Sequence, residues 1–128
     1  MNTLEKWHKA VESRDISVLD EILAENVEFH SPVIWTPQKG TTITKMYLYA
    51  AMHIIGNQEF KYTREVVSNQ HACLEFTTII NGITVNGIDI MTFDQEGKIS
   101  EFKVMVRPLK GMMILKDKMF EFMQQMNG

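Results

Sequence analysis

The spacing of apolar residues along this chain changes twice, from helical to alternating and back to helical. Over residues 3–13 they recur at helical intervals and predict an amphipathic helix with Trp7 on its buried side. Asp15 is placed to cap a second, short helix that ends near Ala24, because its carboxylate can accept from the free amides of the first turn. Two helices are therefore expected before the first strand.

A brief strand follows, in which Val27 and Phe29 alternate with polar neighbours. It is expected to end at Ser31-Pro32, since proline cannot donate to a strand ladder. After a loop over residues 35–40, Thr41 or Thr42 can cap a helix that runs to Ile55. Apolar residues surround most of this helix, so we expect it to be covered on both sides.

From Glu59 onward the pattern is that of strands joined by short turns, which requires antiparallel pairing. The strands are predicted at residues 60–67, 72–80, 83–93 and 99–106. Asn81-Gly82 has the composition of a two-residue hairpin turn, and Asp94 to Gly97 that of a longer loop with glycine in the left-handed conformation. Asn86-Gly87 is interpreted as a bulge or kink, because a turn there would leave too short a strand.

Helical spacing returns at Leu109 or Lys110 and continues to Met126, which predicts a terminal helix over the sheet or over a partner subunit. The order of elements predicts an α+β fold, a curved antiparallel sheet wrapped on N-terminal helices with an additional C-terminal helix. Such a sheet encloses a concave apolar cavity. The length of 128 residues suits a single domain, residues 1–128.

Composition narrows the possible partners and location. The formal net charge is -3 and no basic cluster exceeds two residues, so we expect no nucleic-acid partner. The N-terminus lacks the pattern of a signal peptide and no apolar run is long enough to span a membrane, so a cytoplasmic, membrane-free protein is expected. The single cysteine, Cys73, excludes an internal disulfide. The four histidines are scattered, and we predict no metal site and no cofactor.

Asp89 is the main chemical candidate. It lies inside an apolar strand and shares its face with Met91 and Phe93, because side chains two residues apart point the same way. Burial disfavours the carboxylate, so its pKa is expected to be raised. Two interpretations remain open: an active-site acid or ligand-orienting group, or a structural carboxyl bonded to a neighbour such as Trp7.

At this point the chain resembles the nuclear transport factor 2-like superfamily, which includes SnoaL-like polyketide cyclases and ketosteroid isomerases. The resemblance covers residues 4–106 and implies a cone-shaped α+β fold. It rests on the order and spacing of Arg14-Asp15, Phe29-His30-Ser31-Pro32-Val33, Gly40-Thr41 and the segment from Ile88-Asp89 to Gly97-Lys98.

The resemblance also shows departures at the functional positions. Trp7 stands where the isomerases carry the tyrosine of the oxyanion hole, Ser31 where they carry the proton-shuttling aspartate, and Leu48 where a supporting tyrosine lies. Asp89 alone is kept, as the second acid of the oxyanion hole, which the isomerases hold protonated in an apolar site. Serine is not basic near neutral pH, so double-bond isomerisation by that route is not expected.

SnoaL-like cyclases use a pocket aspartate in a similar setting, so the resemblance implies that Asp89 is the acid/base of an enzyme acting on a small, mostly apolar, carbonyl-bearing molecule. Trp7 and Ser31 would be polar pocket groups. The expected walls are Phe29, Tyr47, Phe76, Met91, Phe102 and Val104. The alternative function is a non-catalytic module of the same fold that binds a small ligand or only dimerises.

Three charged residues alternate with the apolar set of the sheet: Glu75, Lys103 and Arg107. They are expected on the outer face, where they can pair across strands or across a homodimer interface, which this fold commonly builds from that face. A one-residue register shift near Arg107 would instead bring its guanidinium beside Asp89 and lower the pKa of that carboxyl. Arg107 is therefore also a candidate ligand-binding residue.

Overall fold

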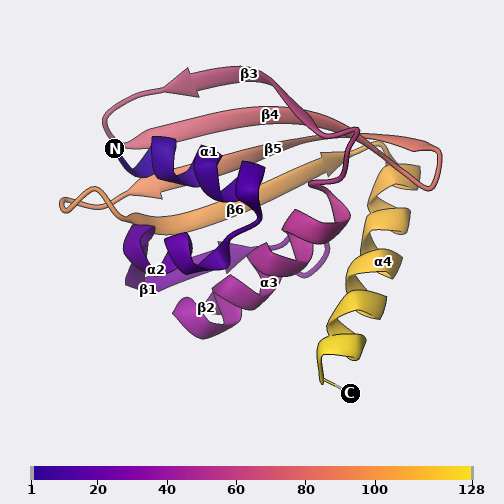
Figure 1. Cartoon of the computed structure of the whole chain (residues 1–128), viewed down its shortest axis with the longest axis horizontal. Coiled ribbons are helices and arrows are strands. Elements are labelled where there is room, and N and C mark those ends of the chain that lie inside the picture. The colour runs from indigo at the N-terminus through magenta and orange to yellow at the C-terminus, as the bar shows by residue number, and fades with distance from the viewer. Residues whose placement is uncertain (1, 128) are drawn as a thin grey trace.

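The computed structural model describes residues 2–127 and has an α+β architecture in which helices lie against one face of a six-stranded sheet (Figure 1). Strand order is β2-β1-β6-β5-β4-β3, with β1 and β6 parallel and the other neighbours antiparallel. The helices are α1 (Thr3–Ser13), the 3-10 turn η1 (Ile16–Val18), α2 (Leu19–Ile22), α3 (Thr41–Ile54) and α4 (Leu109–Asn127). The strands are β1 (Leu23–His30), β2 (Gln38–Lys39), β3 (Lys61–Val67), β4 (His71–Ile80), β5 (Ile83–Phe93) and β6 (Ile99–Arg107).

Side chains cap the N-terminal helices. The Asn2 side chain accepts a hydrogen bond from the Glu5 amide at 2.8 Å and starts α1. Asp15 accepts from the Ser17 amide at 3.0 Å, so it is a cap as predicted, but of the turn η1, and the following α2 ends at Ile22 rather than near Ala24.

The two predicted turns of the β-meander are confirmed. Asn81 (φ 50°) and Gly82 (φ 77°) both take the left-handed conformation that a tight two-residue hairpin requires. Gly97 (φ 79°) takes it in the loop between β5 and β6. These turns set the register that places alternate residues of β4 and β5 on the face covered by the helices.

The predicted bulge at Asn86-Gly87 is wrong. Pairing of β5 with β4 and β6 is regular at this point, and the irregularity of β5 lies between Thr92 and Phe93. Close packing explains the glycine at position 87 instead. A Cβ there would lie 2.4 Å from Cζ of Phe76 and 2.8 Å from the carbonyl oxygen of Met105. The glycine makes room for an aromatic ring that crosses over the strand.

Two further elements differ from expectation. The short strand β2 pairs with β1 inside the segment predicted as a loop, and two residues are too few to show an alternating pattern. Gly40, with φ 100°, precedes the first residue of α3, so neither Thr41 nor Thr42 caps this helix through its side chain.

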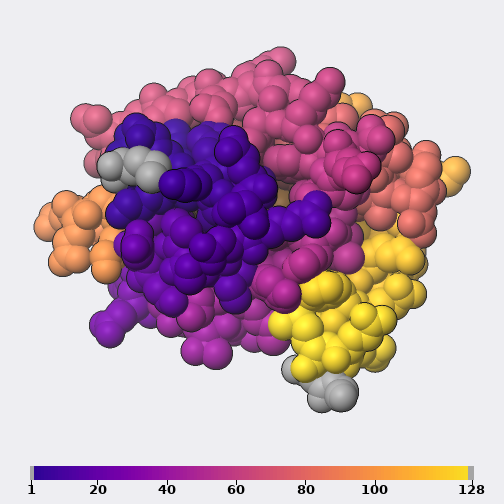
Figure 2. All heavy atoms as spheres, in the orientation of Figure 1, coloured from indigo at the N-terminus to yellow at the C-terminus, as the bar shows by residue number. Residues whose placement is uncertain are grey.

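Helix α4 lies at one end of the sheet and beside α3, as the space-filling view also shows (Figure 2). It contacts α3 and the strands β4, β5 and β6. Leu115 is its deepest apolar side chain, buried to 2 % exposure, whereas Leu109 and Phe120 are largely exposed. The helix therefore covers the apolar interior along only part of its length.

Candidate functional site

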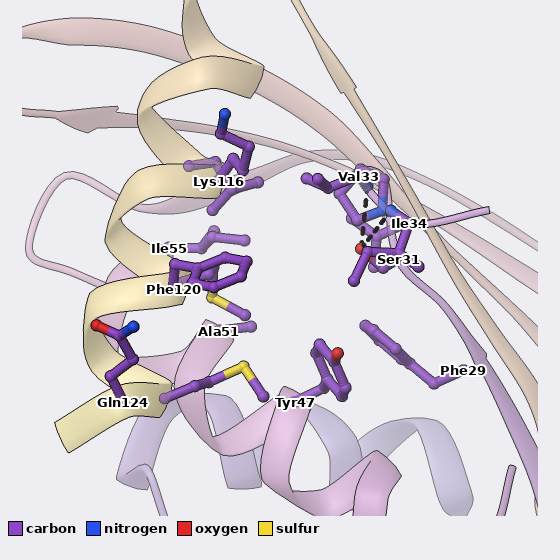
Figure 3. Close-up of a pocket in the computed structure, with 15 residues that line it drawn as sticks. Phe29, Ser31, Val33, Ile34, Tyr47, Ala51, Ile55, Lys116, Phe120 and Gln124 are labelled. Carbon is purple, nitrogen blue, oxygen red and sulfur yellow. Dashed lines mark hydrogen bonds between the residues drawn. The ribbon is translucent and has the colours of Figure 1, made fainter. Parts of the chain in front are cut away.

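Two adjoining cavities lie between the sheet and the helices. The larger one has a volume of about 280 Å³ and is here called the outer cavity. It lies on the helix-covered face of the sheet, and the name does not refer to the outer face. Its walls come from β1, the segment after β1, α3 and α4 (Figure 3). Phe29 and Tyr47 lie on one side, stacked with ring centroids 5.2 Å apart, and α4 supplies the opposite wall. Lys116 and Gln124 of α4 are polar groups on this largely apolar lining.

The smaller, inner cavity has a volume of about 40 Å³ and contains Asp89 on its wall. Trp7, Phe60, Tyr62, Phe76 and Phe102 are the aromatic side chains around it. Ala51, Ile55 and Val104 line both cavities. The two cavities therefore adjoin at these three side chains.

Asp89 is held by a short relay of hydrogen bonds. The hydroxyl of Tyr62 donates to Oδ2 of Asp89 at 2.7 Å, and Nε1 of Trp7 donates to the Tyr62 hydroxyl at 3.0 Å. Asp89 itself is 7 % exposed. Among residues 2–127 it receives no second side-chain hydrogen bond, so its other carboxylate oxygen has bonding capacity left.

Burial dominates the electrostatics of this relay. Removal from water raises the pKa of Asp89 to about 7, while the hydrogen bond from Tyr62 favours the carboxylate and lowers the pKa. The pKa of Tyr62 is raised well above its ordinary value, first by burial and then by the adjacent Asp89. Tyr62 therefore stays a neutral donor while Asp89 exchanges a proton near neutral pH.

The predicted site residues divide between the two cavities. Trp7, Phe76 and Phe102 line the inner cavity, and Phe29, Ser31 and Tyr47 line the outer one. Val104 lines both. Met91 is fully buried in the core and lines neither. The interpretation in which Trp7 bonds Asp89 directly is replaced by the arrangement with Tyr62 between them.

Ser31 is used as a turn residue. Its Oγ accepts from the backbone amides of Val33 and Ile34, at 3.0 and 3.4 Å. These bonds fix the segment that forms part of the outer cavity wall (Figure 3). Ser31 does not line the inner cavity, and its hydroxyl, unlike a carboxylate, cannot act as a base near neutral pH.

Arg107 lies on the outer face of the sheet, where its guanidinium donates to Oδ1 of Asn86 at 3.2 Å. On the same face Glu75 forms an ion pair with Arg64 at 3.3 Å, across β3 and β4. The expected outer-face placement is confirmed, and the alternative that places Arg107 beside Asp89 is wrong. Within residues 2–127 the upward shift in the pKa of Asp89 is opposed by the hydrogen bond from Tyr62 and by no guanidinium.

Tyr62 and the lining residues of α4 were not predicted as site residues. Residues two apart share a face in a regular strand, so Tyr62 and Arg64 would be expected together. The register of β3 shifts between them, placing Tyr62 opposite Phe76 and Arg64 opposite Glu75. The bulge turns Arg64 outward, whereas Tyr62 faces inward beside Phe60, as the alternation of these two aromatic residues with Lys61 and Thr63 indicates.

Tyr62→Phe is expected to raise the pKa of Asp89, because it removes the one hydrogen bond that stabilises the carboxylate. It also leaves Nε1 of Trp7 without its partner, which is expected to cost about 1–3 kcal/mol of stability. Carboxyl ¹³C titration and denaturant unfolding would measure the two effects. Tyr47→Phe is the matched control, and an equal change in both variants would show that the relay has no special role.

Comparison with known proteins places this geometry in a family. The sequence profile described as the SnoaL-like domain matches residues 4–102. A steroid delta-isomerase from Pseudomonas aeruginosa is similar in structure, with a TM-score of 0.91 and 31% sequence identity over 96% of this chain and 90% of that one. A cystatin-like protein from Silicibacter pomeroyi has a TM-score of 0.86 and 27% identity, over 93% and 83% of the two chains.

A more distant likeness shows the fold alone. The epoxide hydrolase/cyclase-like enzyme SalBIII, described with pyran ring formation in the polyether salinomycin, has a TM-score of 0.65 and 17% identity, over 82% of this chain and 88% of that one. No curated protein matches the sequence. Within residues 2–127 no helix is both long and apolar enough to cross a membrane. The profile match and the 31% identical structure establish that the chain belongs to the SnoaL-like domain family, with the nuclear transport factor 2-like, cystatin-like fold.

Proposed function

We propose that this protein is an acid/base enzyme for a small, mostly apolar, carbonyl-bearing molecule, with Asp89 as the group that exchanges the proton. One observation carries the proposal: a buried carboxyl with a pKa of about 7 faces an apolar cavity and has one protein hydrogen bond. Acid/base catalysis is most effective when the pKa lies near the operating pH. In the protonated form Asp89 donates to a carbonyl oxygen, and in the ionised form it removes a proton from the adjacent carbon.

The volumes of the two cavities suit a ligand that has a small polar end and a larger apolar body. The inner cavity of about 40 Å³ has room for the polar end of a molecule. The outer cavity of about 280 Å³ is near the lower limit of ordinary ligand pockets. The carbonyl would enter the inner cavity beside Asp89, while an apolar body would contact Phe29, Tyr47 and the inner side of α4.

The relatives are consistent with this proposal without defining the reaction. The steroid delta-isomerase structure is 31% identical to this chain. The family resemblance implies, however, that Trp7 and Ser31 replace the phenol and the base of the isomerases. In this protein Tyr62 of β3 supplies a phenol instead, and its hydroxyl donates a hydrogen bond to Asp89. The arrangement favours a reaction that needs a single carboxyl as acid and base, as expected of a cyclase- or isomerase-type proton transfer.

A second candidate function is ligand binding without catalysis, and one observation favours it. Among the residues that line the inner cavity, Tyr62 is the only titratable partner of Asp89, and its pKa is too high for it to act as a base near neutral pH. Asp89 would then orient a carbonyl ligand by hydrogen bonding alone.

A thermal-shift screen of small apolar carbonyl compounds on wild type and Asp89→Asn tests both functions. Ligands that bind the native state raise its melting temperature. An enzyme is indicated when a hit is turned over by wild type and still stabilises Asp89→Asn without turnover. A binding module is indicated when affinity changes and no product forms with either protein. The absence of any stabilising hit for wild type would contradict both.

Ala51→Phe is expected to block passage between the cavities, since Ala51 lines both and the added ring would occupy the space they share. A carbonyl ligand identified in the screen should bind at least about tenfold more weakly, because its polar end can no longer reach Asp89. Isothermal titration calorimetry measures the change. Ala10→Gly, in α1 at a residue that lines neither cavity, is a control for altered helix packing. Equal losses of affinity in both variants would argue against a connecting passage.

We also propose that the protein forms a homodimer through the outer face of the sheet. A groove of about 450 Å³ lies there between Arg64, Glu75, Asn86 and Arg107, beside the exposed apolar side chains Val66 and Met105. Sedimentation velocity measures the oligomeric state. A monomer would mean that this surface does not bind a second copy of the chain.

A further inference from the structure

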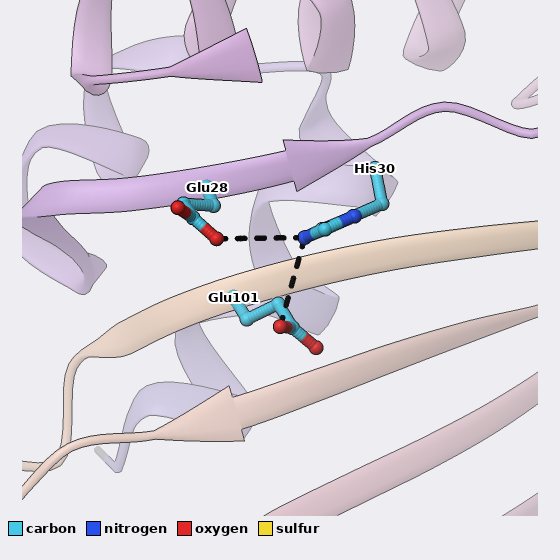
Figure 4. A group of neighbouring side chains, drawn as sticks. All are labelled: Glu28, His30 and Glu101. Carbon is cyan, nitrogen blue, oxygen red and sulfur yellow. Dashed lines mark ion pairs between the residues drawn. The ribbon is translucent and has the colours of Figure 1, made fainter. Parts of the chain in front are cut away.

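A histidine and two glutamates converge on the outer face of the sheet, away from the cavities (Figure 4). Glu28 and His30 come from β1, and Glu101 comes from β6. Their neighbours Phe29 and Phe102 line the cavities on the inner face, so these three side chains point the opposite way. One ligand atom from each of the three residues lies within 4.8 Å of the others.

The imidazole is the unusual member of this group. Its Nε2 atom is buried and has no hydrogen-bond partner in the part of the chain that the structure describes. It lies 3.6 Å from Oε2 of Glu28 and 3.6 Å from Oε2 of Glu101. Both distances exceed the range of a hydrogen bond, although the atom is directed between two carboxylates.

The two separations from Nε2 are close to those between ligands of one tetrahedral metal ion, and the third, between the two carboxylate oxygens, is within 4.8 Å. Bonds from zinc to imidazole nitrogen and carboxylate oxygen measure about 2.0–2.2 Å, so two ligands of a tetrahedral site are about 3.4 Å apart. Octahedral ligands, at right angles, would be about 3.0 Å apart for the same bonds. The spacing of 3.6 Å on both sides of Nε2 is closer to the tetrahedral value.

The ion pair of Glu28 with a lysine leaves its Oε2 atom free. Lys39 of β2 approaches Glu28 through the other carboxylate oxygen, Oε1, at 3.7 Å. Lys103 is the register partner of His30 on β6 and belongs to the same face. The side chains of His30, Glu28 and Glu101 are 23%, 37% and 35% exposed, so water can reach an ion held between them.

We propose that Glu28, His30 and Glu101 form a binding site for a divalent cation of the zinc type, with water as the fourth ligand. One imidazole and two carboxylates are ligands that such ions accept. The ion would link β1 to β6, the parallel pair of the sheet, directly after the register irregularity between Leu23 and Glu28. It would stabilise the attachment of the N-terminal segment to the β-meander.

Titration of wild type with Zn²⁺ alone, followed by calorimetry and by thermal unfolding, tests this site. One saturable site per chain is expected, with a melting temperature that rises on binding. His30→Gln and Glu101→Gln should each weaken the affinity by at least about a hundredfold, since even partners of the ligands contribute 10–100-fold. His71→Gln is the control, because His71 lies on β4 and contacts Thr92 instead.

Co²⁺ absorption gives an independent test of geometry, because a tetrahedral site produces much stronger visible bands than an octahedral one. The proposal predicts these bands in wild type and His71→Gln and their loss in Glu101→Gln. It is overturned if wild type binds no Zn²⁺, or if His71→Gln weakens binding as much as His30→Gln and Glu101→Gln do. Circular dichroism of the metal-free variants verifies that each is folded. If His30→Gln does not fold, Glu101→Gln still tests the site.

Discussion

Asp89→Asn is expected to reduce the turnover proposed for this protein by orders of magnitude while removing the pH-dependent loss of stability that the buried Asp89 carboxyl causes. Loss of a general acid/base typically reduces rates by about 10²–10⁴-fold, and the amide cannot replace the carboxyl in proton transfer. The amide oxygen still accepts the hydrogen bond from Tyr62, and the shape of the side chain is nearly unchanged. Function and stability should therefore change in opposite directions above pH 7.

The sign of the stability effect follows from the pKa of Asp89, raised from 3.8 to about 7 in the folded protein. Below pH 4 the carboxyl is protonated in both states and contributes no difference. Between pH 4 and 7 the unfolded chain has lost the proton that the folded protein retains, so the free energy of unfolding falls as pH rises. The total loss is on the order of 4 kcal/mol, complete above pH 7.

Denaturant unfolding of wild type and Asp89→Asn between pH 4 and 8 measures this effect. The difference in free energy of unfolding between the two proteins should change by about 4 kcal/mol across the range, whatever its value at pH 4. Asp117→Asn, at an exposed carboxylate of α4, is the control for loss of one negative charge. Parallel pH profiles for wild type and Asp89→Asn would contradict the raised pKa.

Gly87→Ala is expected to destabilise the protein by about 3 kcal/mol, at the upper end of the usual cost of overpacking. The new methyl group would lie 2.4 Å from Cζ of Phe76 and 2.8 Å from the carbonyl oxygen of Met105. The ring can shift, but the backbone oxygen belongs to the paired strand β6. A gain of about 0.5–1 kcal/mol from replacing a strand glycine is too small to offset this clash.

A double-mutant cycle with Phe76→Leu identifies the cause of that loss. Leucine lacks the distal ring atoms that the alanine methyl would meet, so Gly87→Ala should cost less in the Phe76→Leu background. Chemical unfolding of wild type, both single variants and the double variant gives the coupling free energy. Strictly additive losses would mean that the ring of Phe76 is not the reason for glycine at this position.

Local patterns were sufficient to predict most of the fold. Alternation gave the four long strands, and Asn81-Gly82 and Gly97 gave the turns that define their antiparallel order. Asp89 was predicted because an acid on an apolar strand face is energetically unusual, and its burial in the folded protein raises its pKa. Gly87 was misinterpreted because a glycine required by packing and one required by a bulge look the same in a sequence.

The partners of Asp89 depend on contacts between distant segments. Tyr62 faces inward beside Phe60, but its meeting with Trp7 requires α1 to lie across the sheet. The outer cavity needs α4, which the spacing alone left free to cover the sheet or another subunit. Likewise, Glu101 meets Glu28 and His30 only through the parallel pairing of β1 with β6. Pairings of this kind are set by tertiary structure rather than by local periodicity.

We infer that Asp89 is a cavity acid that titrates near neutral pH. The most direct test of this inference is the ¹³C chemical shift of the Asp89 carboxyl, followed by NMR from pH 4 to 9 and assigned by comparison with Asp89→Asn. We expect a midpoint at about pH 7. A midpoint near pH 4, the ordinary value for an exposed aspartate, would contradict it.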